Sequence, residues 1–245
     1  QILPGAMPWT HQHIGNPALS SILNALFKSG FSDSYCGMRA FTREAYQRIQ
    51  PRSAGMEFAL EMIINASKAG LRCSEIPIVY HPRLGESKLR TLKDGWRSLR
   101  FMLLYSPTAL FLVPGLLAFG LGVALMALLL FGSPTIGGHP RGNHSMLVGA
   151  LLAILGVQVL ATGLLAKTYS LAERIEPEDA LVARFYRHFN LEKGLLIGGA
   201  LATAGVLIYV YLFAVWARSG FGQLFRERPA VVALVAIVIG VQIIA

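Results

Sequence analysis

Charged residues are scarce in this sequence, and the scarcity is local. Asp, Glu, Lys and Arg together make up 14% of its 245 residues, against about 25% in an ordinary soluble domain. Four stretches contain none of them, namely 108–131, 145–166, 194–217 and 229–245. This distribution excludes an ordinary water-soluble protein and indicates an integral membrane protein.

Cysteine is also nearly absent. Cys36 and Cys73 are the only two, and they do not form a CxxC pair. This excludes a disulfide framework and a four-thiolate zinc site, so we expect both to be small buried residues of a reducing compartment. His11 and His13 have no third potential ligand at a suitable spacing, which argues against a metal site there.

The apolar stretches are long enough to cross a membrane. A span needs about 20 residues, because each adds about 1.5 Å along a helix. We therefore expect four transmembrane helices, at about 107–132, 145–167, 193–217 and 229–245. The chain opens on Gln1 without a signal peptide, and its fourth stretch is short and reaches Ala245. We expect it to be a piece of a longer protein.

Basic residues gather just before the first span. The sequence carries a formal charge of +9, and six Lys or Arg residues lie between Arg83 and Arg100. The positive-inside rule places this end in the cytoplasm, in a multi-pass protein of the cell (inner or plasma) membrane. The last outer loop, 218–229, is somewhat too basic for this topology. Cations at a membrane-entry point favour anionic lipid or phosphate over nucleic acid.

The first hundred residues alternate between helix and strand patterns. We expect a helix beginning at Asn16 (N-cap) and Pro17, another after a Thr42 cap, and a third over 56–69 that ends at Gly70. Residues 34–41 and 73–80 have strand character. Residues 89–106 form a basic, Trp-bearing amphipathic helix suited to the headgroup plane, although a solvated face on a domain helix is the alternative.

The spans themselves have the character of packed helices. Gly194, Gly198 and Ala202 recur every four residues and would let a neighbouring helix approach closely. We find no charge inside any span, which argues against an ion or proton pathway. No internal repeat is evident, which argues against a transporter.

Three stretches combine charge with loop chemistry. In the first, Asp33 precedes a segment bearing Arg39, whose planar fork can grip a phosphate or pair with Asp33. In the second, Glu57 and Glu61 share a helix face, and Glu61 lies inside an apolar run where a helix-dipole role explains it poorly. The third is a polar loop suited to holding an anion, and its candidates are His81, Arg83, Ser87 and Lys88.

The order of these stretches is familiar. PWTHQHIGNP, SDSYCGMRAF, GMEFALEMIINASKAG and EIPIVYHPRLGESKLR precede a membrane helix. Together they resemble the second half of family-two glycosyltransferases of the dolichol-phosphate mannose/glucose synthase type, over residues 3–106. The resemblance implies an α/β remnant of a GT-A-type (Rossmann-like) catalytic domain over 1–88. An amphipathic interfacial helix over 89–106 and a four-helix transmembrane region over 107–245 would follow.

The resemblance also implies roles for single residues. Arg39 matches the family's Gly-x-Arg segment, and Arg83, Ser87 and Lys88 match its basic loop, so these groups would hold the phosphate of the lipid acceptor or the donor. Asp33 matches the acidic residue near the sugar or acceptor. Glu61 and His81 are further expected substrate-binding residues. We expect Asp33, Arg39 and Arg83 to be the catalytic set.

The function implied is transfer of a hexose from a nucleotide-sugar to a polyprenyl (dolichyl or undecaprenyl) phosphate, with inversion, at the cytoplasmic face. Its Mg²⁺ or Mn²⁺ would be held by an Asp-x-Asp motif that this sequence lacks, so we assign no metal ligand here and expect this piece alone to be inactive. A processive polysaccharide synthase would carry Gln-x-x-Arg-Trp, which does not occur. The other alternative is a non-catalytic lipid-binding, flipping or scaffold protein.

Overall fold

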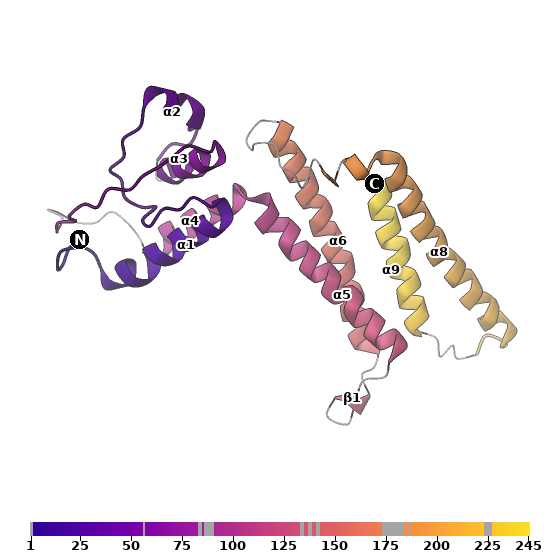
Figure 1. The fold of residues 1–245 in the computed structure, drawn as a ribbon. Helices are drawn as coiled ribbons and strands as arrows, with labels where there is room; N and C mark the ends of the chain where they lie inside the picture. Colours follow the sequence, from indigo (N-terminus) through magenta and orange to yellow (C-terminus); the bar gives the residue numbers. More distant parts are fainter. Residues whose placement is uncertain are drawn as a thin grey trace. The chain divides into compact units, whose positions relative to one another are not determined.

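The chain folds into two compact units, Gln1–Ser106 and Pro107–Ala245. The structure is a computed structural model (Figure 1) that describes residues 2–55, 57–82, 85, 91–132, 135–136, 139–140, 143–172, 184–185, 187–222 and 227–245. The predicted Arg83, Ser87 and Lys88 lie outside the described residues.

The first unit is built from helices around a small apolar core. Its elements are η1 (His11–Gly15), α1 (Asn16–Phe27), α2 (Arg43–Ile49), α3 (Glu57–Lys68) and α4 (Thr91–Leu104). Helices α1, α3 and α4 meet through Leu23, Leu60, Ile64 and Met102, all of which are buried. The apolar faces of these three helices thus pack against one another, as expected for apolar stripes at helical spacing.

The helix ends follow the sequence signals in two of three places. The Thr42 side chain accepts a hydrogen bond from the Ala45 N–H at 3.1 Å, so the predicted cap of α2 is confirmed. Gly70, with φ of 63°, ends the α3 region as predicted. The N-cap role predicted for Asn16 was wrong, because the chain is already helical in the π-helical turn η1 and the Asn16 side chain contacts the Met7 sulfur. The predicted start is confirmed, since α1 begins at Asn16 with Pro17 in its first turn.

The two predicted strands are not formed among the described residues of this unit. Residues 34–41 and 73–80 are extended or turn segments, and only Tyr80 makes a β-bridge, with Ile2. A strand requires a neighbour for its backbone hydrogen bonds, and the described part of the chain offers these segments almost none. Cys73, expected to be buried, is exposed on one of them. The structure therefore does not show an α/β domain.

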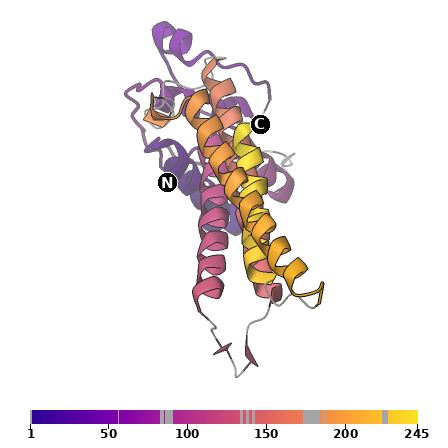
Figure 2. The same cartoon turned by 90° about the vertical axis from the view of Figure 1, so that its right-hand side faces the viewer.

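The second unit contains the four predicted apolar helices. The helices long and apolar enough to span a membrane are Thr108–Phe131, His144–Leu171, Leu191–Arg218 and Glu227–Ile244. They correspond to η2 (Thr108–Leu112) with α5 (Val113–Phe131), α6 (Asn143–Ala172), α8 (Leu191–Arg218) and α9 (Glu227–Ile244). Helix α5 pairs with α6 and α8 with α9, as Figures 1 and 2 show.

A short hairpin lies between the first two spans. It is formed by β1 (Thr135–Ile136) and β2 (His139–Pro140), antiparallel to each other. A core of Met126, Met146 and Ile239, with neighbouring apolar side chains, then joins α5 and α6 to α9. This seam holds the two helix pairs together as one unit.

Small residues set the distance between paired helices. A Cβ added to Gly156 of α6 would lie 2.3 Å from the Phe119 backbone nitrogen of α5. A Cβ on Gly198 of α8 would lie 2.6 Å from the Gly240 carbonyl oxygen of α9, and one on Gly240 would lie 2.6 Å from the Ala202 nitrogen. The predicted packing role of the Gly198 and Ala202 stripe is confirmed, because backbones touch only where side chains are minimal.

Two cations of this unit correct the sequence interpretation. Lys167, expected as the last residue of the second span, lies within α6, which continues to Ala172, and only 3% of its surface is exposed. Its Nζ donates to the Thr108 hydroxyl at 2.6 Å. Arg228 donates to the carbonyl oxygens of Leu129, at 2.8 Å, and Gly132, at 3.5 Å, at the end of α5. Arg228 thus caps the C-terminal end of α5.

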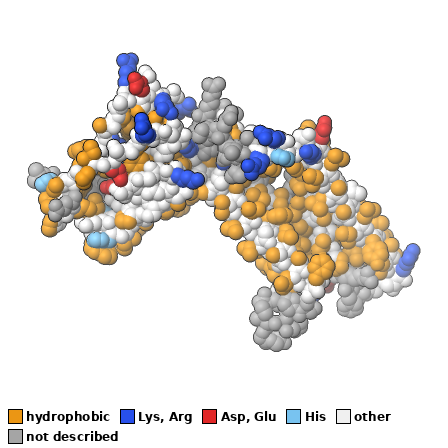
Figure 3. Space-filling view, viewed as in Figure 1, with side chains coloured by type: hydrophobic (Ala, Val, Ile, Leu, Met, Phe, Trp, Pro, Cys, Tyr) orange, Lys and Arg blue, Asp and Glu red, His pale blue; other side chains and the backbone are white. Residues whose placement is uncertain are grey.

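The sides and ends of the membrane unit differ in character. Apolar side chains cover the sides of its helices, and Lys and Arg gather at the end where α8 begins (Figure 3). At that end the Asn190 side chain accepts the Lys193 N–H at 3.0 Å and caps α8. Charge kept to the ends and apolar surface between them is the pattern required of a bilayer-spanning bundle.

Candidate functional site

The turn that carries Asp33 is fixed from two sides. Both carboxylate oxygens of Glu75 accept the Ser32 N–H at 3.0 Å, and Oε1 also accepts the Asp33 N–H at 3.3 Å. Asp33 Oδ1 in turn accepts the Tyr35 N–H at 2.9 Å, which makes an Asx-turn. Asp33 as a whole is exposed.

A buried pair of serines holds the other side of this turn. Ser34 is fully buried; its hydroxyl lies 2.9 Å from that of Ser20 in α1, and its N–H donates to the Ser20 oxygen at 3.2 Å. The turn is therefore attached to α1 as well as to the 73–80 segment. A carboxylate on so constrained a backbone is held in place before any ligand arrives.

Arg39 is oriented by backbone carbonyls and forms no ion pair with Asp33. Its Nη2 donates to the Ser34 carbonyl at 2.8 Å and its Nε to the Cys36 carbonyl at 3.1 Å, while Nη1 donates to the carbonyl of Ala59 in α3. Burial lowers the pKa of Arg39, and the nearby negative groups oppose that shift. A guanidinium has five N–H donors, so two remain for an anion. Its predicted phosphate role stays a prediction.

Glu61 lies in the interior of the unit. Only 1% of its surface is exposed. Oε2 accepts the Arg52 N–H at 3.0 Å and the Ser53 N–H at 2.6 Å, and Oε1 accepts the Tyr105 hydroxyl at 2.9 Å. The carboxylate predicted to bind substrate thus has both oxygens engaged by the fold.

These contacts perturb both titrating groups. Burial raises the pKa of Glu61, but its hydrogen bonds to Ser53, Arg52 and Tyr105 outweigh burial and leave the pKa below the usual value. Burial, followed by the hydrogen bond and the charge of Glu61, raises the pKa of Tyr105 to about 12. Glu61 is therefore ionised and Tyr105 neutral at physiological pH, which is the state that the hydrogen bond between them requires.

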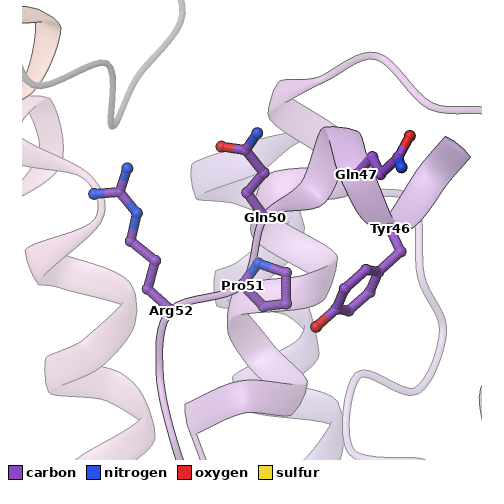
Figure 4. A pocket seen from close by; sticks show the side chains of 5 residues that line it. All are labelled: Tyr46, Gln47, Gln50, Pro51 and Arg52. Carbon is purple, nitrogen blue, oxygen red and sulfur yellow. The ribbon is translucent and has the colours of Figure 1, made fainter. Parts of the chain in front are cut away.

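Arg52 is a candidate that the sequence analysis missed. It borders a shallow pocket of about 550 Å³ lined also by Tyr46, Gln47, Gln50 and Pro51. Figure 4 shows Arg52 extended on the side of the pocket opposite Tyr46. Its guanidinium is exposed and makes no hydrogen bond or ion pair with the described residues. A usable signal was present, namely a lone cation in a Pro- and Gly-containing loop directly before the helix that carries Glu61.

Helix α4 has three distinct faces. One packs inward through Phe101 and Met102. A second exposes apolar side chains, with 89% of Leu92 and 65% of Trp96 accessible. The third is basic: Lys93 and Arg100 are exposed. An exposed apolar stripe beside exposed cations is what an interfacial helix presents to lipid headgroups, so the structure agrees with the predicted amphipathic character of this segment.

One cation of the basic face is already neutralised. Arg97 makes a two-pronged ion pair with Glu57 of α3, in which Nη2 donates to Oε2 at 2.8 Å and Nε donates to Oε1. This hydrogen bond from Arg97 lowers the pKa of Glu57. The carboxylate at the start of α3 therefore fixes α4 against α3 and leaves Lys93 and Arg100 for external anions.

The remaining predicted residues are distributed as follows. His81 is exposed on the segment after Tyr80, within the described part of the chain. Arg39 donates to the carbonyl of Ser34, the residue after Asp33, and Glu61 accepts the backbone N–H of Arg52. Among the described residues, no three His, Cys, Asp or Glu side chains form a group that could hold a metal ion.

Comparison with known proteins confirms the resemblance to family-two glycosyltransferases. Residues 164–245 match the family described as the glycosyltransferase family 2 C-terminal transmembrane region. The whole chain is 40% identical to the low-salt glycan biosynthesis hexosyltransferase Agl6 of Haloferax volcanii, over 59% of that protein. No solved structure gives a significant match.

Two shorter similarities point the same way. The chain is 30% identical to the glycosyltransferase AglJ of Haloferax volcanii over 94 residues, which are 38% of this chain and 31% of AglJ. It is 32% identical to a dolichyl-phosphate hexose transferase of the same organism over 82 residues, which are 33% of this chain and 35% of that protein. The chain thus spans less than two thirds of the length of each of these relatives.

Proposed function

We propose that this chain is the membrane-anchoring and acceptor-side part of a glycosyltransferase. The full-length enzyme would move a hexose from a nucleotide-sugar to a polyprenyl phosphate, with inversion, at the cytoplasmic face. The observation that carries this proposal is the 40% identity, along the whole chain, to a protein named as a hexosyltransferase. The relative named as a dolichyl-phosphate hexose transferase supports the lipid phosphate as acceptor.

The chemistry needs positioning more than proton transfer. A polyprenyl phosphate brings an oxygen that is already anionic, so attack on the anomeric carbon needs little general-base help. Two anions, the acceptor phosphate and the donor diphosphate, must nevertheless approach each other. Fixed cations that offset this repulsion stabilise the transition state, because they are in place before charge moves.

The described residues supply part of this arrangement. Arg39 retains two N–H donors, Arg52 presents a free guanidinium beside a pocket, and Asp33 offers one carboxylate oxygen near Arg39. We assign the cations to the phosphate groups and Asp33 to the sugar or to acceptor alignment. Arg83, Ser87 and Lys88 remain proposed phosphate ligands on the resemblance alone, as does His81.

The membrane side of the proposal rests on α4 and on the distribution of charge. The apolar stripe at Leu92 and Trp96 would enter the headgroup layer and the basic face would attract anionic lipid. Arg228 caps α5 and keeps its charge, so the last outer loop remains somewhat basic. The six Lys and Arg residues between Arg83 and Arg100 support a cytoplasmic first unit by the positive-inside rule.

We further propose that the longer protein completes the α/β GT-A-type domain that the resemblance implies. The extended 34–41 and 73–80 segments would then gain strand neighbours from residues outside this chain. A Mg²⁺ or Mn²⁺ ion at the donor diphosphate would be held by acidic residues of that same part, where it would offset the charge of the leaving nucleotide.

The test is transfer by the full-length protein in membranes. Wild type and Arg83→Ala are given labelled nucleotide-sugars and polyprenyl phosphate, with Arg72→Ala as the control, because Arg72 is an exposed arginine that makes no hydrogen bond to the described residues. We expect a loss of about tenfold or more for Arg83→Ala, since a hydrogen bond to a charged group is removed, and no loss for Arg72→Ala. Equal activity of both variants would remove Arg83 from the mechanism.

The alternative, a non-catalytic lipid-binding, flipping or scaffold protein, predicts a different outcome. Such a protein would bind polyprenyl phosphate in vesicles, yet no labelled sugar would enter the lipid fraction with any nucleotide-sugar. Lipid binding without transfer by full-length wild type would favour this alternative.

A further inference from the structure

We infer that Glu61 is a positioning residue that attaches the loop carrying Arg52 to the last turn before the first membrane span. In this role Glu61 does not touch substrate and acts through its neighbours. The part of the inference that concerns the lipid acceptor rests on the proposed function. The structural part, a mechanical link between residues 52–53 and Tyr105, stands on the described contacts alone.

The Glu61 carboxylate has the features of a fixed structural anion. It is 1% exposed and receives three hydrogen bonds, two from backbone N–H groups and one from a hydroxyl. The carboxylate binds two segments that are far apart in sequence: Oε2 accepts hydrogen bonds from the loop, and Oε1 accepts one from Tyr105. Removing one donor would release a buried charge from one of its few partners, which is costly in a dry interior.

The position of the two backbone donors decides what Glu61 controls. The N–H of Arg52 and the N–H of Ser53 bind the same oxygen, Oε2. The peptide groups on both sides of the Arg52 Cα are thereby held, so the origin and direction of the Arg52 side chain are fixed. The guanidinium itself remains exposed beside the pocket, free to meet an anion.

The other end of the link is also well anchored. The Tyr105 carbonyl accepts a hydrogen bond from Lys68 Nζ at 3.1 Å, and that ammonium lies 5.3 Å from the centre of the Tyr105 ring. The ring of Phe101 lies 4.6 Å from that of Tyr105. Tyr105 is followed two residues later by Pro107, the first residue of the membrane unit. Glu61 thus connects the Arg52 loop to Tyr105, just before the chain enters the membrane unit.

The link can be tested without measuring activity. Arg52–Ser53 and Arg72–Cys73 are both bonds after an exposed Arg that trypsin can attack. In full-length protein reconstituted in liposomes, Tyr105→Phe and Glu61→Gln should each speed cleavage at Arg52–Ser53 by about three- to tenfold, the equivalent of one hydrogen bond. Cleavage at Arg72–Cys73 should not change. Tyr169→Phe, which removes an exposed tyrosine hydroxyl elsewhere, should behave as wild type.

Two results of this assay would overturn the link. Unchanged cleavage at Arg52–Ser53 in both variants would show that Glu61 and Tyr105 do not hold the loop. Equal acceleration at both bonds would show general loosening of the unit, and the specific positioning role would be wrong.

The functional part needs kinetics of the same variants. We expect Tyr105→Phe to raise the KM for polyprenyl phosphate by about three- to tenfold, while the KM for the nucleotide-sugar changes less than about twofold, because we place Arg52 at the acceptor phosphate. A loosened loop with an unchanged acceptor KM would overturn the positioning role. If wild type transfers no sugar, the proposed function fails, and the proteolysis result still decides whether the link exists.

Discussion

Replacing Gly156 with Ala should force the first helix pair of the membrane unit apart. The added Cβ would lie 2.3 Å from the Phe119 nitrogen and 2.7 Å from its Cα, whereas ordinary van der Waals contact begins at 3.4 Å. The obstructing atoms are backbone, so no side-chain rotation relieves the clash. The helices would have to separate by about 1 Å (3.4 less 2.3) along this contact. Overpacking of this kind costs about 1–3 kcal/mol.

Gly120→Ala is the matched control for this change. Gly120 lies on the partner helix α5, and a Cβ there would meet nothing within 4 Å. Alanine is a better helix former than glycine by about 0.8–1.0 kcal/mol, so this variant should be neutral or slightly more stable. The two substitutions are therefore expected to differ in sign, although both remove a glycine from a membrane helix.

The assay is unfolding of the detergent-purified protein, followed by heating or by SDS titration. Gly156→Ala should unfold at a lower temperature or SDS fraction than wild type, and Gly120→Ala at the same value or a higher one. Equal stability of the two variants would refute the close backbone approach of α5 and α6 on which the description of this unit depends.

Three further predictions concern single contacts. Thr42→Ala removes the cap of α2 and should lower the free energy of unfolding by about 1 kcal/mol, measured by denaturant titration. The pKa of Glu61 in the folded protein is depressed below 4.5, so Glu61 should stabilise the fold above pH 4.5 and lose this effect as the pH falls through the folded pKa. In Glu61→Gln, the free energy of unfolding measured as a function of pH should therefore vary less over this range. Arg228→Gln should destabilise the membrane unit by about 0.5–1 kcal/mol through loss of the α5 cap, read from SDS unfolding, whereas a neutral outcome would show that the cap contributes nothing.

Hydropathy and cap signals predicted the helical elements because both depend on short-range sequence. The four apolar stretches became helices since lipid requires every backbone group to be paired within the segment. Thr42 ended as a cap because its hydroxyl needs only the N–H three residues later. The packing role of the small-residue stripe at Gly198 was also predictable, because a residue without a side chain lets a neighbouring helix approach closely.

Features that depend on partners distant in sequence could not be predicted from short-range patterns. Residues 34–41 and 73–80 carry strand composition, yet a strand forms only with a neighbour, and the described chain offers one bridge at Tyr80. Lys167 ended within α6 because the helix continues beyond the apolar stretch and supplies a hydroxyl partner, Thr108, from another span. A composition window cannot detect such a partner.

The candidate site shows the same division. The sequence correctly singled out Glu61 as a carboxylate unexplained by a helix-dipole role, but it could not show that two backbone N–H groups and Tyr105 occupy it. For Arg39 the residue type allowed a phosphate, a carboxylate or carbonyl partners. Three carbonyls bind it here, and two donors remain. Arg52 was missed although a lone cation in a Pro- and Gly-containing loop was a usable signal; its exposure and the pocket beside it are properties of the folded loop.

The proposed activity is tested most directly by mass spectrometry of the lipid product. Full-length protein in membranes is supplied with polyprenyl phosphate and a set of nucleotide-sugars, and the lipid extract is examined for new species. We predict one product whose mass equals the polyprenyl phosphate plus a single hexose residue, linked to the anomeric carbon with inverted configuration. Correctly inserted protein that yields no hexosylated lipid with any donor would contradict the account.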